Sequence, residues 1–260
     1  MPSSLQWLSR SLLGACLLAA PVWAQEAKPA APAAPTTPAK KEAADEPAIK
    51  MGNDKGAGFL RRHEGFLADL KAKNGKVGVL FVGDSITDGW RGKNGKETFA
   101  GHYGSMDPLN IGIGGDRTQH VLWRLENGEV EGISPKVAVL MIGTNNLGGN
   151  TNEEIAAGVT KIVKTLHAKL PQTKILLLGI FPRGMSADDK NRGRIKAINE
   201  QLAKLDDGSM TVKYLDIGQK FLTDDGTLTK EVMPDALHPN EKGYQVWAEA
   251  MDPTLKELMK

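Results

Sequence analysis

The chain has 260 residues, of which 40% are hydrophobic and 25% charged. This composition is typical of one soluble globular domain and unlike that of a disordered chain or a bundle of membrane helices. The formal net charge is only +2, and the lysines are scattered among acidic residues rather than gathered in a basic stripe, so we expect no nucleic-acid partner.

Residues 1–24 have the layout of a cleavable secretory signal, with Arg10 in a short polar start, an apolar run over residues 11–23 and the small Ala24 before the expected cleavage point. A membrane anchor is the alternative. However, Pro21 interrupts the apolar run, which is also shorter than the roughly 20 residues that a spanning helix needs. The sequence therefore predicts an exported protein, periplasmic or secreted, with no integral membrane span after removal of the signal.

Cys16 is the only cysteine in the chain and lies inside this segment. The stretch Leu13–Cys16 loosely resembles a lipoprotein processing site, in which the cysteine normally follows the apolar run. Here Leu17–Ala20 continue the run, so we favour a small apolar filler over lipoprotein anchoring. In either case the domain that follows contains no cysteine, which excludes disulfides, thiol catalysis and cysteine-ligated metals.

Residues 25–52 are predicted to form a disordered linker. Up to about residue 50 the segment consists almost entirely of Ala, Pro, Lys, Glu and Thr, with no apolar periodicity. Such a composition cannot bury enough surface to offset the entropy of the chain. The folded domain is therefore expected over residues 53–260.

Apolar segments after residue 53 follow the alternation of a βα protein. The spacing of Phe59, Phe66 and Leu70 predicts an opening helix. Short apolar runs typical of buried parallel strands follow at Val77–Val82, Leu109–Ile113, Val137–Ile142, Lys174–Ile180 and Val212–Asp216. Amphipathic stretches predict helices over Asn152–Leu170, Asp188–Leu205 and Glu241–Met259. Together these elements predict an α/β fold with one five-stranded parallel sheet covered on both faces.

Polar, glycine-containing blocks follow the first three predicted strands, at the sheet edge where ligands bind in open parallel sheets. They are Gly83–Asp88 (GDSITD), Gly112–Asp116 (GIGGD) and Gly143–Asn146 (GTNN), and a fourth, Asp235–Pro239 (DALHP), precedes the last helix. We therefore expect the four blocks to meet.

Ser85, Asp235 and His238 are the candidate catalytic residues. A hydroxyl nucleophile needs a base within hydrogen-bond reach, and the base needs an acid that fixes its tautomer. Asp235 and His238 supply both from one loop. Asp84 and Asp116 flank tight glycine turns, where aspartate commonly bonds the backbone, and are interpreted as structural. The remaining histidines, none of which has both an acid three residues earlier and a strand-end position, are His63, His102, His120 and His167.

The oxyanion that forms in such chemistry needs preorganised donors, which a glycine-rich backbone and an asparagine amide can provide. Gly115 and Asn145 lie at strand ends where they can act as such donors, together with the backbone amide of Ser85. The residues alone do not decide between Gly115 and Gly114, or between Asn145 and Asn146.

The four blocks together are similar to those of the SGNH (GDSL-type) hydrolases, whose four name-giving residues match Ser85, Gly115, Asn145 and His238. The resemblance covers nearly the whole domain. The stretch Asn110–Asn146 is especially similar to the catalytic subunits of the intracellular platelet-activating-factor acetylhydrolase Ib branch. This resemblance implies a flavodoxin-like three-layer αβα sandwich, hydrolysis of short acyl esters, and the oxyanion role for Asn145 and Gly115.

Two departures from the family bear on function. Ile86 replaces the leucine of the name GDSL, a conservative change that leaves the chemistry intact. The predicted export signal makes a phospholipid mediator a poor substrate and favours an acetylated or otherwise acylated carbohydrate of the envelope or environment. The alternatives are a phospholipid or lysophospholipid acylhydrolase and a catalytically silent carbohydrate-binding module on the same fold.

The candidates for walls of the acyl pocket are the apolar residues that adjoin the blocks: Ile86, Leu147, Phe181 and Leu237. The sequence contains no His-Glu-x-x-His and no histidines with metal-ligand spacing, so we expect no metal and no other cofactor. The sequence leaves open whether the protein forms a homodimer. It contains no heptad repeat or large apolar helix face that would require one.

Overall fold

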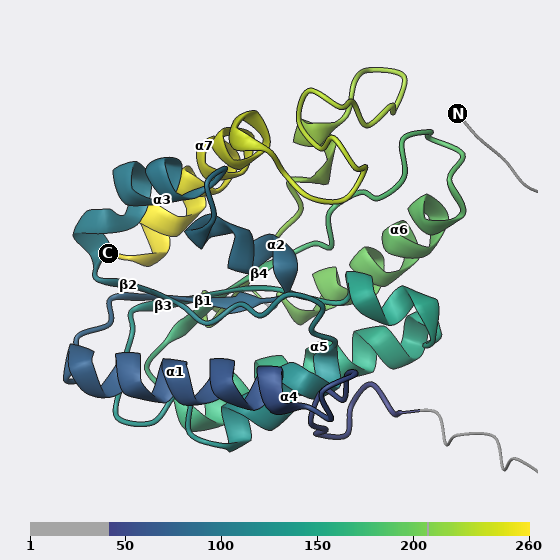
Figure 1. Cartoon of the computed structure of the whole chain (residues 1–260). Coiled ribbons are helices and arrows are strands. Elements are labelled where there is room, and N and C mark those ends of the chain that lie inside the picture. The colour runs from purple at the N-terminus through teal and green to yellow at the C-terminus, as the bar shows by residue number, and fades with distance from the viewer. Residues whose placement is uncertain (1–41, 207) are drawn as a thin grey trace, which may run out of the picture. The chain divides into compact units, whose positions relative to one another are not determined.

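The computed structural model describes residues 42–206 and 208–260 of the chain. The predicted signal over residues 1–24, including Cys16, and the first part of the predicted linker therefore lie outside the described residues. In the described part, a parallel sheet lies between two layers of helices (Figure 1). The predicted three-layer α/β sandwich is thereby confirmed.

Five parallel strands form one sheet in the order β2-β1-β3-β4-β5. They are β1 (Val79–Gly83), β2 (Pro108–Asn110), β3 (Val137–Met141), β4 (Lys174–Leu178) and β5 (Val212–Leu215). β1 and β3 are neighbours, with Val79 opposite Val137, although β2 comes between them in sequence. The chain therefore reverses its direction across the sheet at β1 and β3, and ligands bind outside the carboxyl ends of strands at such a point.

Helices cover both faces of the sheet (Figure 1). On one face lie α1 (Ala57–Lys73), α4 (Thr118–Glu126), α5 (Asn152–Lys169) and α6 (Lys190–Leu202), and on the other α3 (Lys96–Tyr103) and α7 (Glu241–Leu258). The single turn α2 (Ser85–Asp88) follows β1, and the short 3₁₀ segments are η1 (Gly89–Arg91), η2 (Gly104–Met106), η3 (Thr144–Gly148), η4 (Ala203–Leu205) and η5 (Gly218–Phe221). The sequence predicted α1, α5, α6 and α7 but not α3 or α4. Within the part of the chain that the structure describes, no helix is both long and apolar enough to cross a membrane.

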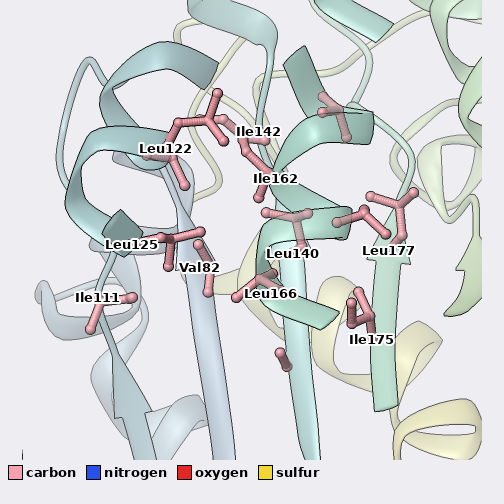
Figure 2. Packing of buried hydrophobic residues seen from close by; sticks show 14 of the residues in the cluster. Val82, Ile111, Leu122, Leu125, Leu140, Ile142, Ile162, Leu166, Ile175 and Leu177 are labelled. Atoms are coloured by element: carbon pink, nitrogen blue, oxygen red, sulfur yellow. The ribbon is translucent and has the colours of Figure 1, made fainter. Parts of the chain in front are cut away.

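Two hydrophobic cores lie on the two faces of the sheet. Side chains along a strand point alternately to opposite faces, so Val82 and Leu140 enter the first core while Phe81 and Val139 enter the second. Figure 2 shows the first core, where strand residues lie against Ile162 of α5. Full burial of such a side chain stabilises the fold by about 1.5–3 kcal/mol, and the sheet edge that carries the polar blocks is thereby held rigid.

A cluster of aromatic side chains in the second core joins the segment after β1 to the C-terminal helix α7. The ring of Trp90 in η1 lies 4.4 Å from that of Tyr244 and 4.8 Å from that of Trp247, both in α7. The Tyr244 hydroxyl also donates a hydrogen bond to the Ile86 carbonyl at 2.8 Å. α7 is therefore fixed against the segment that directly follows β1.

Residues 42–50, which we term the N-terminal strap, pack against the domain although they were predicted to be disordered linker. Ala44 is buried, and its carbonyl accepts a hydrogen bond from Thr118 Oγ1 at 2.6 Å. The Ala48 N–H donates to the Gln119 carbonyl at 3.1 Å. The boundary predicted at residue 53 is therefore too late, because the strap binds largely through backbone atoms that its composition does not reveal.

Candidate active site

Ser85 is presented at the carboxyl end of β1 by a tight strand-to-helix turn. β1 ends at Gly83, and the Asp84 side chain caps α2 by accepting the Ile86 N–H at 3.0 Å. Ser85 is thus the first residue of α2, so its own N–H has no acceptor within the helix. Its Oγ lies 2.9 Å from Nε2 of His238, although the two residues are far apart in sequence.

His238 and Asp235 form the second contact of the site, as predicted from their spacing. Nδ1 of His238 lies 2.7 Å from Oδ2 of Asp235, while Asp235 Oδ1 accepts the backbone N–H groups of His238 and Leu237 at 2.7 and 3.1 Å. Partial burial works to raise the pKa of Asp235, but hydrogen bonds from the His238 backbone and ring hold it below its ordinary value. The ionised carboxylate therefore places the proton on Nδ1, and Nε2 is left to accept the Ser85 proton.

A neighbouring loop stabilises the loop that carries Asp235 and His238. Ala236, between the acid and the base, has a φ of +60°, a left-handed conformation that few non-glycine residues adopt. Its carbonyl accepts the Gly184 N–H from the loop after β4 at 3.1 Å. The segment between Asp235 and His238 is therefore held in one shape rather than left free.

Gly114 and Gly115 form the turn that faces the nucleophile. A Cβ built on Gly114 would lie 3.9 Å from Ser85 Cβ, and Gly115 has a φ of +77°, which favours glycine. The Gly114 N–H is taken by Asp88 Oδ2 at 3.1 Å. By contrast, the Gly115 N–H has no acceptor among residues 42–206 and 208–260. Of the two, only Gly115 has an amide available for an oxyanion.

Asn145 and Asn146 also differ in whether the side-chain amide is available to an oxyanion. Asn145 is half-buried, and its Nδ2 donates to the Asp116 carbonyl at 2.8 Å, which leaves a second Nδ2 proton available. Asn146 is fully buried, its Oδ1 accepts the Thr118 N–H at 3.0 Å, and its Nδ2 donates to side chains around it. The geometry therefore agrees with Asn145 as the oxyanion donor, and its catalytic role stays a prediction.

Three of the four predicted pocket residues lie in the protein core instead. Ile86 is 1% exposed, Leu147 7% and Phe181 2%, and the Phe181 ring packs 4.9 Å from that of Trp247. These side chains adjoin the polar blocks in sequence, but they point into the layers that support the blocks, so their assignment as pocket walls is wrong. Leu237 is half-buried beside the triad and stays a prediction.

Asp84, directly before the nucleophile, is fully buried. Its bond to the Ile86 N–H confirms that it binds backbone, whereas Oδ2 has no partner in the described part of the chain. Burial raises the pKa of Asp84 from 3.8 to about 7, and the charge of Asp116 adds to the increase. This residue supports the turn that presents Ser85.

Asp116 is also fully buried, and its partners are charged side chains that the sequence analysis did not identify. Oδ2 accepts Arg124 Nε at 2.9 Å, and Oδ1 accepts Lys50 Nζ at 2.9 Å. Arg124 is itself fully buried and pairs with Glu129. A lone arginine within the apolar stretch of α4 was the available signal. No comparable signal marked Lys50, because this residue falls within the predicted linker.

The other histidines have partners elsewhere or face solvent. Nδ1 of His120 accepts the Arg117 N–H at 3.0 Å, and burial, with help from the Lys50 charge, lowers the pKa of His120 to about 3. His63 contacts Glu129, His102 contacts Asp252 and His167 is exposed on α5. The prediction that His238 is the base is therefore the one that the geometry supports.

A cavity of about 630 Å³ lies beside α6 and the end of β5, and none of the triad residues lines it. Its polar lining is engaged within the protein. The Tyr214 hydroxyl donates to Asp216 Oδ2 at 3.3 Å, and Arg192 donates to the Arg183 and Gly184 carbonyls. The size of this cavity therefore does not locate the chemistry, which lies where Ser85 meets His238.

Known proteins share both the sequence pattern and the fold. Residues 81–246 match the GDSL-like lipase/acylhydrolase family. The chain is 37% identical over 210 residues to platelet-activating factor acetylhydrolase IB subunit alpha1 of Homo sapiens, with 77% of this chain and 84% of that one covered. Its fold is similar to that of a candidate acylhydrolase from Bacteroides fragilis, at a TM-score of 0.65 and 22% identity over 79% of this chain and 100% of that one. The acetyl xylan esterase AlAXEase is also similar, at a TM-score of 0.59 and 20% identity over 68% and 98% of the two chains.

These similarities confirm the predicted SGNH hydrolase family and its platelet-activating-factor acetylhydrolase Ib-like branch. They also establish the reaction class as the hydrolysis of carboxylic esters. The contacts that join Ser85, His238 and Asp235 at the switch point of the sheet are those that this reaction requires. The chain is a carboxylic ester hydrolase that belongs to the GDSL-like lipase/acylhydrolase family.

Proposed function

We propose that this protein is a serine esterase that removes short acyl groups, acetyl above all, from carbohydrates or other acylated molecules of the cell envelope or environment. The observation that carries the proposal is the pair of contacts from Ser85 Oγ to His238 Nε2 at 2.9 Å and from His238 Nδ1 to Asp235 Oδ2 at 2.7 Å. The nucleophile, the base and the acid that orients the base are thus within hydrogen-bond distance of one another before substrate binds.

In the first half of the reaction, Ser85 Oγ attacks the ester carbonyl carbon while its proton passes to His238 Nε2. The carbonyl electron pair moves onto oxygen, where the Ser85 and Gly115 amides and the free Asn145 Nδ2 proton stabilise it. When the tetrahedral intermediate collapses, the bond to the alcohol oxygen breaks and His238 protonates the leaving alcohol. An acyl-enzyme on Ser85 remains.

In the second half, His238 takes a proton from water, and the resulting hydroxide attacks the acyl carbon through a second oxyanion held by the same donors. Collapse breaks the bond to Ser85 Oγ, which recovers its proton from His238, and the carboxylic acid leaves. The ionised Asp235 stabilises the imidazolium in both halves.

The open setting of the triad supports a bulky alcohol group and a small acyl group. The His238 and Asp235 side chains are 42% and 57% exposed, so a leaving group as large as a glycan can reach them from solvent. Ile86 and Phe181, which adjoin the polar blocks in sequence, are buried in the core and leave no opening of their own beside the nucleophile. Two of the similar proteins are by name an acetylhydrolase and an acetyl xylan esterase.

A phospholipid ester is the second candidate substrate, favoured by the 37% identity to a platelet-activating factor acetylhydrolase subunit. Such a substrate carries the same acetyl ester on a lipid alcohol. Parallel assays with an acetylated xylo-oligosaccharide and an acetylated ether phospholipid separate the two proposals, since each has its own leaving alcohol.

The test of the main proposal is hydrolysis of p-nitrophenyl acetate, butyrate and octanoate by the purified protein and by Ser85→Ala. We expect hydrolysis that falls steeply from acetate to octanoate and is abolished in the variant. Release of acetate from the acetylated oligosaccharide should exceed its release from the phospholipid. Equal hydrolysis of octanoate would contradict the short-acyl preference, and full activity of Ser85→Ala would overturn the assigned nucleophile.

Export is also a proposal, supported by the signal-like layout of residues 1–24. N-terminal sequencing of the protein purified from its source should give Gln25 as the first residue. An intact N-terminus on protein that stays in the cytoplasm would overturn the proposal.

A further inference from the structure

Lys50 of the N-terminal strap contacts the turn that faces the nucleophile. Its Nζ donates to the Gly114 carbonyl at 2.6 Å and to Asp116 Oδ1 at 2.9 Å. The Gly114 carbonyl belongs to the same peptide group as the Gly115 N–H. In a trans peptide group the C=O and the N–H point in opposite directions, so a cation on the carbonyl fixes the direction of the amide on the far side.

The cation also strengthens that amide as a donor. Hydrogen bonds polarise one another along a chain of groups, most strongly where water is scarce. A charged donor on the Gly114 oxygen draws electron density through the peptide group and makes the Gly115 N–H more positive. Position and polarity of the Gly115 amide are therefore both set by Lys50.

Asp116 links Lys50 to the other predicted oxyanion donor. The backbone carbonyl of Asp116 accepts Asn145 Nδ2 at 2.8 Å, and its buried carboxylate accepts both Lys50 and Arg124. Arg124 pairs with both Asp116 and Glu129, so Lys50 supplies a second cation to this buried group of charges. Its contact with the Gly114 carbonyl is the part of the arrangement that Arg124 cannot replace.

The strap holds Lys50 in place through contacts distributed along its length. Lys161 of α5 donates to the Asp45 carbonyl at 2.7 Å, and Gln119 donates to Glu42 Oε2 at 2.9 Å. The side chain of Lys50 is 23% exposed, whereas that of Asp116 is 0% exposed. Most of the Lys50 side chain is therefore covered by the protein, with its charged end on Gly114 and Asp116.

We propose that Lys50 is a positioning residue for the oxyanion hole, which aligns the Gly115 amide through the Gly114 carbonyl and the Asn145 amide through Asp116. This inference rests on the proposed function, because it takes Ser85 as the nucleophile and these two groups as the oxyanion donors. Lys50 itself touches neither substrate nor the reacting atoms. The strap that joins the N-terminal segment to the domain is thus part of the catalytic apparatus.

The test compares Lys50→Met with Lys136→Met, a matched loss of a lysine that donates to a backbone carbonyl, that of Met259, away from the strap and the turn. Loss of a whole oxyanion donor slows turnover by about 100- to 1,000-fold. A misaligned donor should cost less, so we expect Lys50→Met to lower kcat on p-nitrophenyl acetate by about tenfold with KM unchanged. Lys136→Met should keep the wild-type kcat, and Lys50→Arg should recover most of the loss.

A short alkyl boronic acid supplies a second readout, because its serine adduct is tetrahedral and places a boron-bound oxygen in the oxyanion hole. Its affinity should fall about as much as kcat in Lys50→Met, a change that a general loss of stability would not produce. If Lys50→Met does not fold, Lys50→Gln, which keeps a neutral donor, serves in its place and should lose less activity.

Three outcomes bear on the proposal. Unchanged kcat in the folded Lys50 variants, or an equal loss in Lys136→Met, would overturn it. A loss of kcat with unchanged boronic acid affinity would overturn it as well. Absence of Ser85-dependent hydrolysis in the wild-type protein would instead show that the proposed function itself is wrong.

Discussion

Asn145 and Asn146 are adjacent in the chain, yet their side chains have opposite environments. Asn146 is fully buried and both ends of its amide are hydrogen-bonded, whereas Asn145 is half-buried and its Nδ2 donates to the Asp116 carbonyl. The 3₁₀ turn η3 places the Asn145 amide beside Asp116 and directs the Asn146 amide toward Thr118 and Gln119 of α4. The two residues should therefore respond to substitution in different ways.

Asn145→Ala should lower kcat by about 100-fold or more with little change in the free energy of unfolding, because it removes an oxyanion donor. Asn146→Ala should lower the free energy of unfolding by about 1–3 kcal/mol, because the Thr118 N–H loses its buried partner. Steady-state kinetics and urea unfolding of both variants measure the difference. The same loss of kcat at full stability in Asn146→Ala would contradict the assignment.

Asp235→Asn should lower kcat by about 10⁴-fold, since an amide leaves the His238 tautomer unspecified. Glu231→Gln, which changes an exposed acid on the same segment, is the control and should be fully active. Because hydrogen bonds from His238 hold the pKa of Asp235 below its ordinary value, the carboxylate stays ionised in mildly acidic solution and takes up no proton of its own. The logarithm of kcat/KM should therefore fall with a slope near 1 as pH decreases, and a slope near 2 would contradict the single-group interpretation.

Asp84→Asn should stabilise the protein at high pH. Burial raises the pKa of Asp84 from 3.8 to about 7, so between these values the folded state holds a proton that the unfolded state has released. Stability therefore falls as pH rises through this window, by about 1.4 kcal/mol for each pH unit within it. An asparagine keeps the oxygen that caps α2 and has no charge to bury.

Urea unfolding of the wild-type protein and of Asp84→Asn at pH 4, 6 and 8 measures this effect. The two proteins should have similar stability at pH 4, and the variant should exceed the wild type by a few kcal/mol at pH 8. A difference that stays constant over this range would show that folding does not raise the pKa of Asp84.

Leu237→Ala and Phe181→Ala separate a predicted pocket wall from a core residue. Phe181 is 2% exposed, so its truncation should cost about 3–5 kcal/mol of stability and leave the ratio of acetate to butyrate hydrolysis unchanged. Leu237 is half-buried next to the base, and its truncation should raise the relative rate on butyrate. If Leu237→Ala keeps the wild-type ratio, its assignment to the acyl pocket is wrong.

The sheet and its polar blocks could be predicted because their signals are local. Each strand is a short apolar run, and each block follows a strand end, so the parallel topology itself brings Ser85, Gly115 and Asn145 to one edge. α3 and α4 were missed for equally local reasons. α3 contains few apolar residues, and the N-cap of α4 is Arg117, with His120 as its cap partner, rather than a serine, threonine or aspartate.

The supporting contacts of the site could not be predicted, because they join residues that are distant in the chain. Lys50 reaches Asp116 across 66 positions, and no pattern in the strap distinguishes it from a linker. Ile86 and Phe181 were misplaced for a related reason. A residue next to a catalytic block in sequence can point either into the site or into the core. Tertiary packing decides between these directions, and the local sequence does not show which one applies.

The aromatic contact between Trp90 and α7 has a consequence for the order in which the enzyme becomes active. Ser85 and His238 are 153 positions apart, and a ribosome releases the N-terminal part of a domain first. The sheet can assemble from its early strands, but the nucleophile has no base until the last helix docks against Trp90. Ester hydrolysis therefore requires the C-terminal part of the chain, which supplies His238 and the helix that packs on Trp90.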